Sequence, residues 1–430
     1  MNDLKKDILS LIEKYNDSKD ESIFIPGVSP VPVSGRVYDN SDVSMLIESA
    51  LEFWLTSGKF NEEFESNLAK FLSTKRILTV NSGSSANLLA FSSLKSHLVK
   101  NNIQDGDEVI TVAAGFPTTV NPIIQNNCIP VFVDVELPGY NIDTKKIEAA
   151  ITKKTKAIMI AHTLGNPFEV DEIQRICKEN NLFLIEDCCD ALGSEYKGAK
   201  VGSFGDVATL SFYPAHHITM GEGGAVFSSK HLILKALESI RDWGRDCWCP
   251  PGKDNTCGVR FNWKLGDLPK GYDHKYIYSH LGYNLKITDM QAAVGLAQLG
   301  HLKEFISIRK RNFNLLKNGL SNLDDKIILP VPTENSDPSW FGFPITVREQ
   351  NIREKFINFL NEKKIGTRLI FAGNLVKQPY MKNLKFKVSG DLKNTDIIMN
   401  DSLWIGVYPG LNKNMLNYMV ECIQDFFKGN

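Results

Sequence analysis

The sequence has no long apolar run and almost no net charge. None of its hydrophobic stretches approaches the roughly 20 residues that a membrane-spanning helix needs, and its polar first residues do not have the pattern of a signal peptide. The formal net charge is −1, so no electrostatic field favours binding to nucleic acid or to an anionic membrane. We therefore expect a cytoplasmic protein that acts on a small molecule or a protein partner.

Internal repeats, low-complexity segments and a disulfide framework are also missing. With 43% hydrophobic and 23% charged residues over 430 positions, the chain predicts one large globular domain and a smaller one. Eight cysteines are too few for a disulfide scaffold of this length. Three stand alone, namely Cys128, Cys177 and Cys422, and five fall in two groups, Cys188 and Cys189 and then Cys247, Cys249 and Cys257. Grouped cysteines in a reducing compartment indicate metal binding.

Short apolar runs alternate with helical patterns in the first half of the chain. The runs cover residues 76–80, 108–113, 129–135, 157–161, 182–185, 207–212 and 225–228. Buried strands separated by helices predict a mainly parallel sheet with helices on both faces. A ligand of such a sheet lies beyond the carboxyl ends of its strands. Because the informative residues follow strand-like runs, we expect a single shared site there.

Four parts are expected along the chain. Residues 1–35 predict an amphipathic helix and a proline-rich extended arm that packs on a neighbour. Residues 36–243 form the large domain, and residues 244–281 form an irregular insertion rich in cysteine, proline, glycine and aromatics. Long irregular segments are often functional. Residues 282–430 form the smaller C-terminal domain, which ends in an amphipathic helix near 415–427.

Residues 81–87 read Asn-Ser-Gly-Ser-Ser-Ala-Asn, follow a predicted strand and open a helix. The backbone amides of Gly83 and Ser84 then point at a possible anion, with the helix dipole behind them. A phosphate suits this position. The alternative is a plain helix N-cap built from small residues.

Residues 211–224 read Ser-Phe-Tyr-Pro-Ala-His-His-Ile-Thr-Met-Gly-Glu-Gly-Gly. This segment resembles the cofactor-lysine segment of the nucleotide-sugar aminotransferases of pyridoxal phosphate (PLP) fold type I, the DegT/DnrJ/EryC1/StrS family, which reads roughly S-F-H-P-x-K-N-I-T-x-G-E-G-G. The resemblance covers about residues 30–425 and places His216 where the lysine stands. An amine condenses with the cofactor aldehyde, whereas an imidazole can only move protons. The sugar 3-dehydratase branch carries this substitution.

The fold implied by the resemblance is an aspartate aminotransferase-like α/β domain with a mainly parallel sheet, followed by a smaller C-terminal α/β domain. The implied cofactor is pyridoxamine phosphate (PMP), the amine form of PLP, held noncovalently. Phe116 would stack on its pyridine ring, and Asp187 would keep the pyridine nitrogen protonated. From the residues alone, Phe116 also suits a hydrophobic core and Asp187 a solvated turn.

The resemblance implies further contacts to the cofactor. Ser211 would donate to the phosphate, and Asn166 would lie near the cofactor hydroxyl. Asn284, in a segment resembling G-Y-N-x-R-x-T-D, would reach the phosphate bound by the neighbouring subunit, which implies a homodimer. Of the two adjacent imidazoles, His216 and His217, only one can face the cofactor well, because neighbouring side chains of an extended segment point apart.

Three residues are candidates for contact with the substrate. Arg368 and Tyr408 lie in segments that resemble substrate-side loops of the family. The planar guanidinium of Arg368 suits a diphosphate, although an exposed helix-end arginine is the competing interpretation. Tyr213, three residues before His216, would assist a leaving hydroxyl or tune the cofactor, with simple packing as the alternative.

Four cysteines give the pattern C-x57-C-x-C-x7-C. They are Cys189, Cys247, Cys249 and Cys257. The spacing resembles that of the iron-sulfur 3-dehydratases of CDP-sugar metabolism and implies a 2Fe-2S cluster held by four thiolates. By general rules zinc also suits C-x-C, and buried packing of Cys189 is a further alternative. Cys188 points the other way along a strand and is predicted not to be a ligand.

The resemblance as a whole implies a PMP-dependent dehydratase that removes the C3 hydroxyl of CDP-4-keto-6-deoxy-D-glucose in 3,6-dideoxysugar and lipopolysaccharide O-antigen biosynthesis. His216 would move the proton, and a separate flavin and iron-sulfur reductase would supply electrons through the cluster. One alternative is a GDP-4-keto-6-deoxymannose 3-dehydratase, which lacks the cluster. Another class is a noncatalytic PLP-fold binding protein. The residues alone do not identify the nucleotide base.

Overall fold

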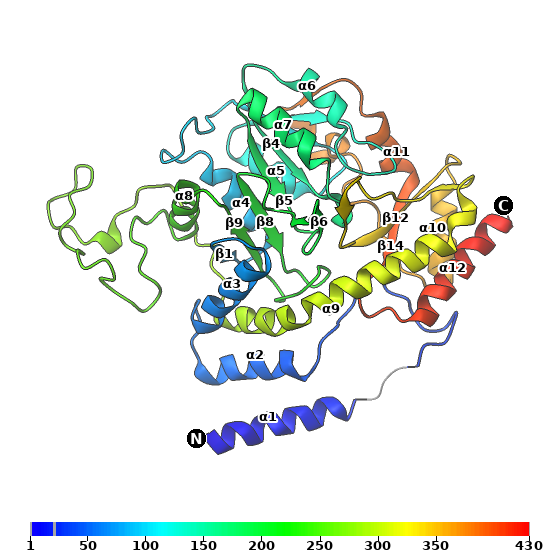
Figure 1. Ribbon diagram of the computed structural model, residues 1–430, viewed down its shortest axis with the longest axis horizontal. Coiled ribbons are helices and arrows are strands. Elements are labelled where there is room, and N and C mark those ends of the chain that lie inside the picture. The colour runs from blue at the N-terminus through cyan, green and yellow to red at the C-terminus, as the bar shows by residue number, and fades with distance from the viewer. Residues whose placement is uncertain (1, 20–22, 430) are drawn as a thin grey trace.

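The computed structural model describes residues 2–19 and 23–429. Its centre is an eight-stranded sheet with the order β1-β9-β8-β5-β4-β2-β3-β13 (Figure 1). In this order the strands are Ile77–Val80, Gly224–Phe227, Val207–Ser211, Phe183–Asp187, Thr155–Ala161, Glu108–Val112, Ile129–Val133 and Lys387–Val388. All pairs from β8 to β13 are parallel, and β9 is antiparallel to both of its neighbours. The predicted strands and the mainly parallel sheet are confirmed.

Helices cover both faces of this sheet, as its apolar strands require. Alternate residues of a strand point to opposite faces, so Met159 of β4 packs in one buried cluster and Ile158 and Ile160 pack in another. The first face is covered by α4 (Gly83–Ser93), α5 (Pro117–Gln125) and α8 (His231–Arg241). The second is covered by α3 (Lys59–Phe71), α7 (Val170–Asn180) and α9 (Asp289–Gly319).

The C-terminal part has a small sheet and a core of its own. The sheet is antiparallel and consists of β10 (Ile327–Ile328), β12 (Gly342–Val347) and β14 (Ser402–Gly406). Helices α10 (Arg353–Glu362) and α12 (Lys413–Lys428) bury their apolar residues in this core. Further elements are α6 (Ile147–Ala150), α11 (Lys393–Asp401) and a three-stranded sheet of β11 (Ser336–Asp337), β6 (Glu195–Tyr196) and β7 (Ala199–Lys200).

Helix α9 links the two cores. It begins at a capping box formed by Thr288 and Gln291, and it runs past α2 (Asn40–Glu52) and α3. Near its other end, Phe313 and Leu316 are buried in the C-terminal core. The expected division at residue 282 falls just before this shared helix, and the domain boundaries stay predictions.

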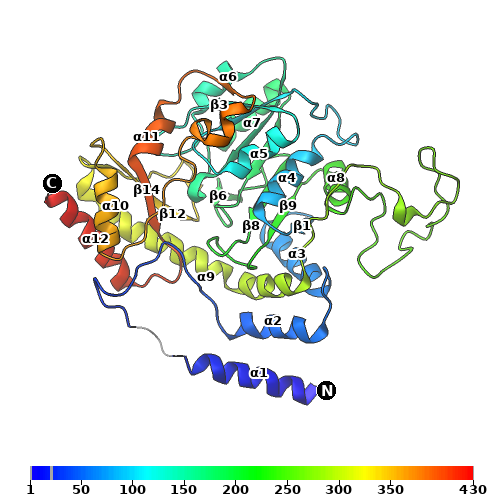
Figure 2. The same cartoon turned by 180° about the vertical axis from the view of Figure 1, so that it is seen from behind.

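Two segments lie outside the main body. Helix α1 (Asn2–Asp17) runs beside α2 at one edge of the molecule (Figures 1 and 2). Of the expected N-terminal helix and arm, residues 1 and 20–22 lie outside the described residues, and its packing on a neighbour stays a prediction. The insertion, residues 244–281, projects beyond α8 in both views (Figures 1 and 2). Within the described ranges, no helix is long and apolar enough to cross a membrane.

Candidate active site

A cavity of about 1020 Å³ opens at the carboxyl ends of the parallel strands. Its walls come from the loops after β5 and β8, from the first turns of α4 and α5, and from Arg368 and Trp404 of the C-terminal part. Ligand pockets commonly measure about 300–1,000 Å³, so this cavity can hold a large ligand. It lies at the sheet edge where the sequence pattern predicts a single site.

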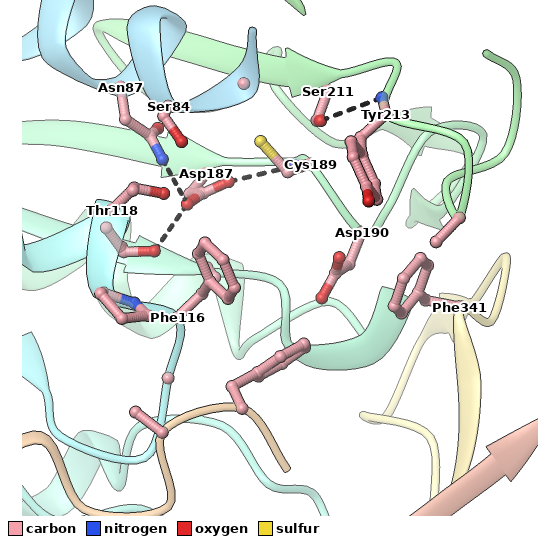
Figure 3. A pocket seen from close by; sticks show the side chains of 18 of the residues that line it. Ser84, Asn87, Phe116, Thr118, Asp187, Cys189, Asp190, Ser211, Tyr213 and Phe341 are labelled. Carbon is pink, nitrogen blue, oxygen red and sulfur yellow. Dashed lines mark hydrogen bonds between the residues drawn. The ribbon is translucent and has the colours of Figure 1, made fainter. Parts of the chain in front are cut away.

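Most of the predicted site residues line this cavity. They are Gly83, Ser84, Phe116, Asp187, Cys189, Ser211, Tyr213, His216 and Arg368. Figure 3 shows the side chains of Phe116, Asp187 and Tyr213 around the same space. Phe116 is 52% exposed and meets Phe371 edge-on, with ring centroids 6.0 Å apart. A ring so exposed is not a core residue, and its face is available to a planar ligand.

The start of α4 approaches β8 very closely at Gly83. A Cβ on Gly83 would lie 2.5 Å from Cβ of Ser211 and 2.8 Å from its Oγ, so only glycine permits this approach. Ser82 caps the helix, its Oγ accepting from the Ser85 N–H at 3.0 Å. The first N–H groups of a helix have no partner within the helix. They therefore form, with the Ser211 hydroxyl, a cradle that suits a phosphate.

Asp187, the last residue of β5, is held by three donors (Figure 3). Its Oδ2 accepts from Asn87 Nδ2 at 2.8 Å and from Thr119 Oγ1 at 2.7 Å, and its Oδ1 accepts from the Cys189 N–H at 3.1 Å. Asn87 is fixed in turn, because its Oδ1 accepts from Thr209 Oγ1 at 2.7 Å. The carboxylate thus has one fixed orientation, which suits a protonated ring nitrogen.

Sequence reasoning missed Asn87 and Thr119 as the residues that orient Asp187. Asn87 closes the stretch 81–87, and Thr119 lies three residues after Phe116. The available signal was a polar residue in the first turns of each helix. Their common target could not be seen, because it lies on a strand about a hundred residues away from Asn87.

His216 stands in the cavity wall with 14% of its side chain exposed. Its Nδ1 lies 3.6 Å from Oδ1 of Asp190 and has no hydrogen-bond partner. Its ring is tilted against Phe341, with centroids 5.0 Å apart. Behind it, the buried Arg309 donates to the His216 carbonyl at 3.0 Å. The His216 backbone is therefore held by Arg309, and its ring packs against Phe341 in the cavity wall.

The pair of His216 and Asp190 is neutral at neutral pH. Burial, together with the positive charge of Arg309, lowers the pKa of His216 to about 4. Burial and the nearby Asp187 raise the pKa of Asp190 to about 8. A neutral imidazole can accept a proton, and a protonated carboxyl beside it can exchange one. Asp190, three residues after Asp187, was missed from the sequence because no motif marks it.

His217 does not line the cavity, although the backbone at residues 213–218 turns and bends and is not the extended segment that the alternation assumed. It is 2% exposed, and its Nε2 donates to the Ser339 carbonyl at 2.8 Å. Burial, with Arg309 adding to the effect, lowers its pKa. Only His216 faces the site.

The structure corrects the placement of Asn166. Its side chain is fully buried outside the cavity lining. Nδ2 donates to the Gly139 carbonyl at 3.0 Å, and Oδ1 accepts from the Thr333 N–H at 3.0 Å. The Asn166 amide therefore connects two loops by hydrogen bonds to their backbones. It does so because the chain turns before residue 166 reaches the cavity. Thr163, three residues earlier, lines the cavity instead.

Three further residues predicted to bind the substrate or the cofactor lie at the edge of the main cavity or outside it. Arg368 is exposed at the cavity mouth, and its Nη1 donates to the Thr367 carbonyl at 2.9 Å. Tyr408 lines a second cavity of about 440 Å³ that shares His216 and Tyr213 with the first. Asn284 is exposed at the base of the insertion, where its Oδ1 accepts from Lys286 Nζ at 2.8 Å. Its predicted contact is with a second subunit and stays a prediction.

The four predicted metal-ligating cysteines are split between two places. Cys189 lines the main cavity, whereas Cys247, Cys249 and Cys257 line a small cavity in the insertion. In the described part of the chain, no close group of three or more ligating side chains contains any of them. A single chain therefore does not fit a four-thiolate cluster. Cys188 is fully buried, with ligating atoms of His162 and Glu186 close to its thiol, and its predicted lack of a ligand role stays a prediction.

Most of the chain matches a single family of known proteins. Residues 37–424 match the DegT/DnrJ/EryC1/StrS aminotransferase family. The chain belongs to this family. The family membership expected from residues 211–224 is thus confirmed.

Two relatives in the family are similar over nearly the whole chain. The lipopolysaccharide biosynthesis protein RfbH of Salmonella typhimurium is 58% identical over 430 residues, which is 99% of this chain and 98% of RfbH. The dTDP-4-dehydro-2,6-dideoxy-D-glucose 3-dehydratase of Saccharopolyspora spinosa is 51% identical over 427 residues, covering 99% of this chain and 92% of that protein.

A solved structure from the family confirms the fold class. The GDP-4-keto-6-deoxy-D-mannose-3-dehydratase of E. coli, determined with bound hydrated PLP, superposes with a TM-score of 0.82 at 27% identity. The match covers 91% of this chain and 98% of that one. The PLP-dependent aminotransferase-like fold with a large, mainly parallel sheet is therefore shared.

Gly83→Ala is expected to lower the affinity for PMP by about 10- to 100-fold, because each tenfold step corresponds to about 1.4 kcal/mol and the new methyl forces α4 away from Ser211. Isothermal titration with PMP measures this. Gly300→Ala is the matched control, because a Cβ there meets nothing within 4 Å. Equal affinities for the two variants would show that the cradle does not bind the phosphate.

Proposed function

We propose that this chain is a PMP-dependent nucleotide-sugar 3-dehydratase, which removes the C3 hydroxyl of a 4-keto-6-deoxy sugar. One observation carries the proposal: the cavity wall has an imidazole, His216, and its lining residues include no lysine within the described part of the chain. Family members named aminotransferases need an amine to bind PLP covalently, and an imidazole cannot take that role. The named relatives that act as 3-dehydratases support the same enzyme class.

The residues of the cavity fit PMP. The N–H groups at the start of α4 and the Ser211 hydroxyl suit its phosphate, in a cradle that a Cβ on Gly83 would fill. Phe116 presents an exposed ring face, and Asp187 presents a carboxylate oriented by fixed donors. When bound, PMP supplies an amine for the sugar ketone and a ring that accepts electrons.

The chain itself contributes proton transfer and positioning. Nε2 of His216 accepts a proton, which the neutral state of its imidazole permits. Oδ1 of Asp190 lies 3.6 Å from the other ring nitrogen, Nδ1, where it can take up or supply a proton. Tyr213, exposed in the cavity wall, has a hydroxyl that can donate a proton to a leaving oxygen. Arg368 at the mouth offers a forked donor for the diphosphate.

The preferred substrate in this proposal is CDP-4-keto-6-deoxy-D-glucose. The support is the cysteine spacing, which resembles that of iron-sulfur enzymes of CDP-sugar metabolism. A dTDP-linked sugar is the second candidate, because a relative at 51% identity is a dTDP-4-dehydro-2,6-dideoxy-D-glucose 3-dehydratase. A GDP-linked sugar has weaker support, since the GDP-4-keto-6-deoxy-D-mannose 3-dehydratase of E. coli is 30% identical.

The remaining parts of the proposal concern partners. A 2Fe-2S cluster on Cys189, Cys247, Cys249 and Cys257 is proposed from their spacing, together with a flavin and iron-sulfur reductase. The described chain alone does not assemble these thiols, so we route no step through the cluster. We also propose a cytoplasmic homodimer and a role in lipopolysaccharide O-antigen biosynthesis, in keeping with the name of the relative RfbH.

The test supplies PMP and a 4-keto-6-deoxy sugar linked to CDP, dTDP or GDP, with heavy oxygen at C3. A 3-dehydratase releases the label into water, and the fastest substrate identifies the base. Formation of a 4-amino sugar that requires an amine donor, with the label kept at C3, would refute the proposal. Binding of PMP with no release from any substrate would favour a noncatalytic binding protein.

Asp190→Asn is expected to lower kcat by about 10- to 100-fold with little change in KM. The asparagine keeps the size of the side chain but cannot exchange a proton with Nδ1 of His216. Steady-state kinetics with the preferred sugar measure the split. Cys188→Ser, a change on the other side of the strand end, serves as the control. A rise in KM alone would show that Asp190 only binds substrate.

A further inference from the structure

We propose that Arg309 is a positioning residue, which fastens the loop of His216 to the start of β12 so that the C-terminal part of the chain holds the imidazole in place. Arg309 does not line the main cavity, so it acts through His216 and does not touch a ligand there. The inference rests on the role of His216 in the proposed function. It gives a task to a residue that no motif of the sequence marks.

The guanidinium of Arg309 binds backbone carbonyls of two segments that are remote in the chain. Nη2 donates to the His216 carbonyl at 3.0 Å. Nη1 donates to the carbonyls of Trp340 at 3.3 Å and Phe341 at 3.2 Å. His216 lies in the loop after β8, and Phe341 comes directly before β12. The planar fork of an arginine can hold both segments in one fixed arrangement, which a single ammonium group cannot do.

His216 and Phe341 also meet through their side chains. The His216 ring is tilted against the Phe341 ring at 5.0 Å, and the Phe341 ring packs in turn on Trp404 at 5.2 Å. The Trp404 N–H donates to the Arg368 carbonyl at 2.7 Å, and the Arg368 N–H donates to the Trp404 carbonyl at 3.0 Å. All four residues line the main cavity, and Figure 3 shows Phe341 at its wall. Continuous contacts therefore run from the cavity mouth to the imidazole, and Arg309 fastens their inner end.

Arg309 carries its positive charge in the core without an acid close by to neutralise it. The residue is 1% exposed, and its Nε has no hydrogen-bond partner. Among the residues that the structure describes, no carboxylate lies within ion-pair distance of the guanidinium, and Asp190 stabilises its charge from further away. Burial lowers the pKa of Arg309 to about 10, which leaves it charged at neutral pH. Since such a charge destabilises a fold, packing alone does not account for an arginine here.

The charge of Arg309 acts on the imidazole in addition to its hydrogen bonds. The titratable or charged groups around the His216 ring are Asp187 and Asp190 from the end of β5 and the residues after it, Arg309 from α9, and the adjacent His217. The segment before β12 contributes an uncharged aromatic ring. Arg309 adds to the effect of burial in lowering the pKa of His216, and Asp187 opposes both. Removal of the cation is therefore expected to raise this pKa.

Two substitutions of Arg309 separate position from charge. Arg309→Lys keeps the charge but cannot hold three carbonyls in the same geometry, so we expect kcat to fall about 10-fold with KM and the pH profile unchanged. Arg309→Met removes both, and we expect kcat to fall about 100-fold. Because a protonated imidazole cannot accept a proton, the acid limb of its pH profile should also move up by about one pH unit or more. A merely structural role would lower thermal stability without moving this limb.

A second measurement does not depend on the reaction. NMR of protein with isotope-labelled histidine follows the titration of His216, whose signal is assigned by its loss in His216→Asn. Arg309→Met should raise the pKa of His216 by about one pH unit or more. In addition, guanidinium ion is expected to restore part of kcat to Arg309→Ala, whereas uncharged urea of similar shape is not. The second cavity of about 440 Å³, which Arg309 lines, gives the ion access.

Arg353→Met is the matched control. Arg353 also donates to a backbone carbonyl, that of Met399, and its Nε also has no partner, but it lines neither cavity. This variant should lose stability and keep both kcat and the pH profile.

Each outcome decides the role of Arg309. Wild-type kcat in Arg309→Lys, or an unchanged pKa of His216 in Arg309→Met, would overturn the proposal. If Arg309→Met does not fold, kcat of Arg309→Lys decides alone. Wild-type protein that releases no labelled C3 oxygen would refute the proposed function instead, and the NMR titration would still test the effect of Arg309 on His216.

Discussion

Replacing His216 with asparagine is expected to lower kcat by about 10²- to 10⁴-fold, the usual contribution of a positioned acid-base group, while PMP remains bound. Asparagine fills a similar volume but has no nitrogen that accepts a proton at neutral pH. The cradle at Gly83 and the carboxylate of Asp187 are untouched by the change. Release of labelled C3 oxygen measures kcat, and equilibrium dialysis measures PMP.

The pH dependence adds a second readout for His216. Because burial and Arg309 lower its pKa to about 4, its imidazole stays neutral well below pH 6, and wild-type activity should not fall at the ordinary histidine pKa of about 6.5.

The matched control for His216→Asn is His217→Asn, in which the second imidazole is lost from the core near Ser339. That variant should be less stable but keep kcat. A larger kcat loss in His217→Asn than in His216→Asn would reverse the assignment.

Asp187→Asn is expected to lower kcat by about 10²- to 10³-fold, as removal of one key electrostatic contact does in other active sites. The amide carries no charge to hold a protonated ring nitrogen. In addition, the donors Asn87 and Thr119 would face an NH₂ group in one of its two orientations. Steady-state kinetics give kcat, and the visible spectrum with PMP reports the state of the ring.

The control for Asp187 is its neighbour Glu186, on the opposite face of β5. The Glu186 carboxylate accepts from the N–H groups of Gly202 and Phe204 and from His162 Nε2 at 3.1 Å. Glu186 is not among the residues that line the main cavity. Glu186→Gln should reduce thermal stability, because it weakens these buried bonds, but should leave kcat unchanged. If both variants lost kcat equally, the effect of Asp187→Asn would be one of stability.

Much of the site could be predicted from local sequence because its residues directly follow predicted strands. Phe116, Asp187 and Ser211 follow or end strands, and the ends of parallel strands meet at one edge of the sheet. Asn166 was placed near the cofactor by the family resemblance, and the structure does not put it in the cavity lining. Its position after β4 is correct, but the backbone turns through Leu164, at φ 52°, and directs the amide into a loop.

Asp190 shows what local patterns leave out. Its importance depends on its distance to His216, a residue 26 positions further along a different segment, and on burial that raises its pKa to about 8. Neither quantity has a signature in the order of residues. The same applies to Arg309, which comes from α9 to bind the His216 carbonyl.

The sequence by itself determined the parallel sheet, the family and the replacement of lysine by His216, because hydrophobic periodicity and short motifs are properties of neighbouring residues. The tertiary structure alone decided which imidazole faces the cavity, which groups hold Asp187, and that Cys189 lies apart from the thiols of the insertion. These depend on distances between segments remote in the chain, which packing fixes only once the whole fold has formed.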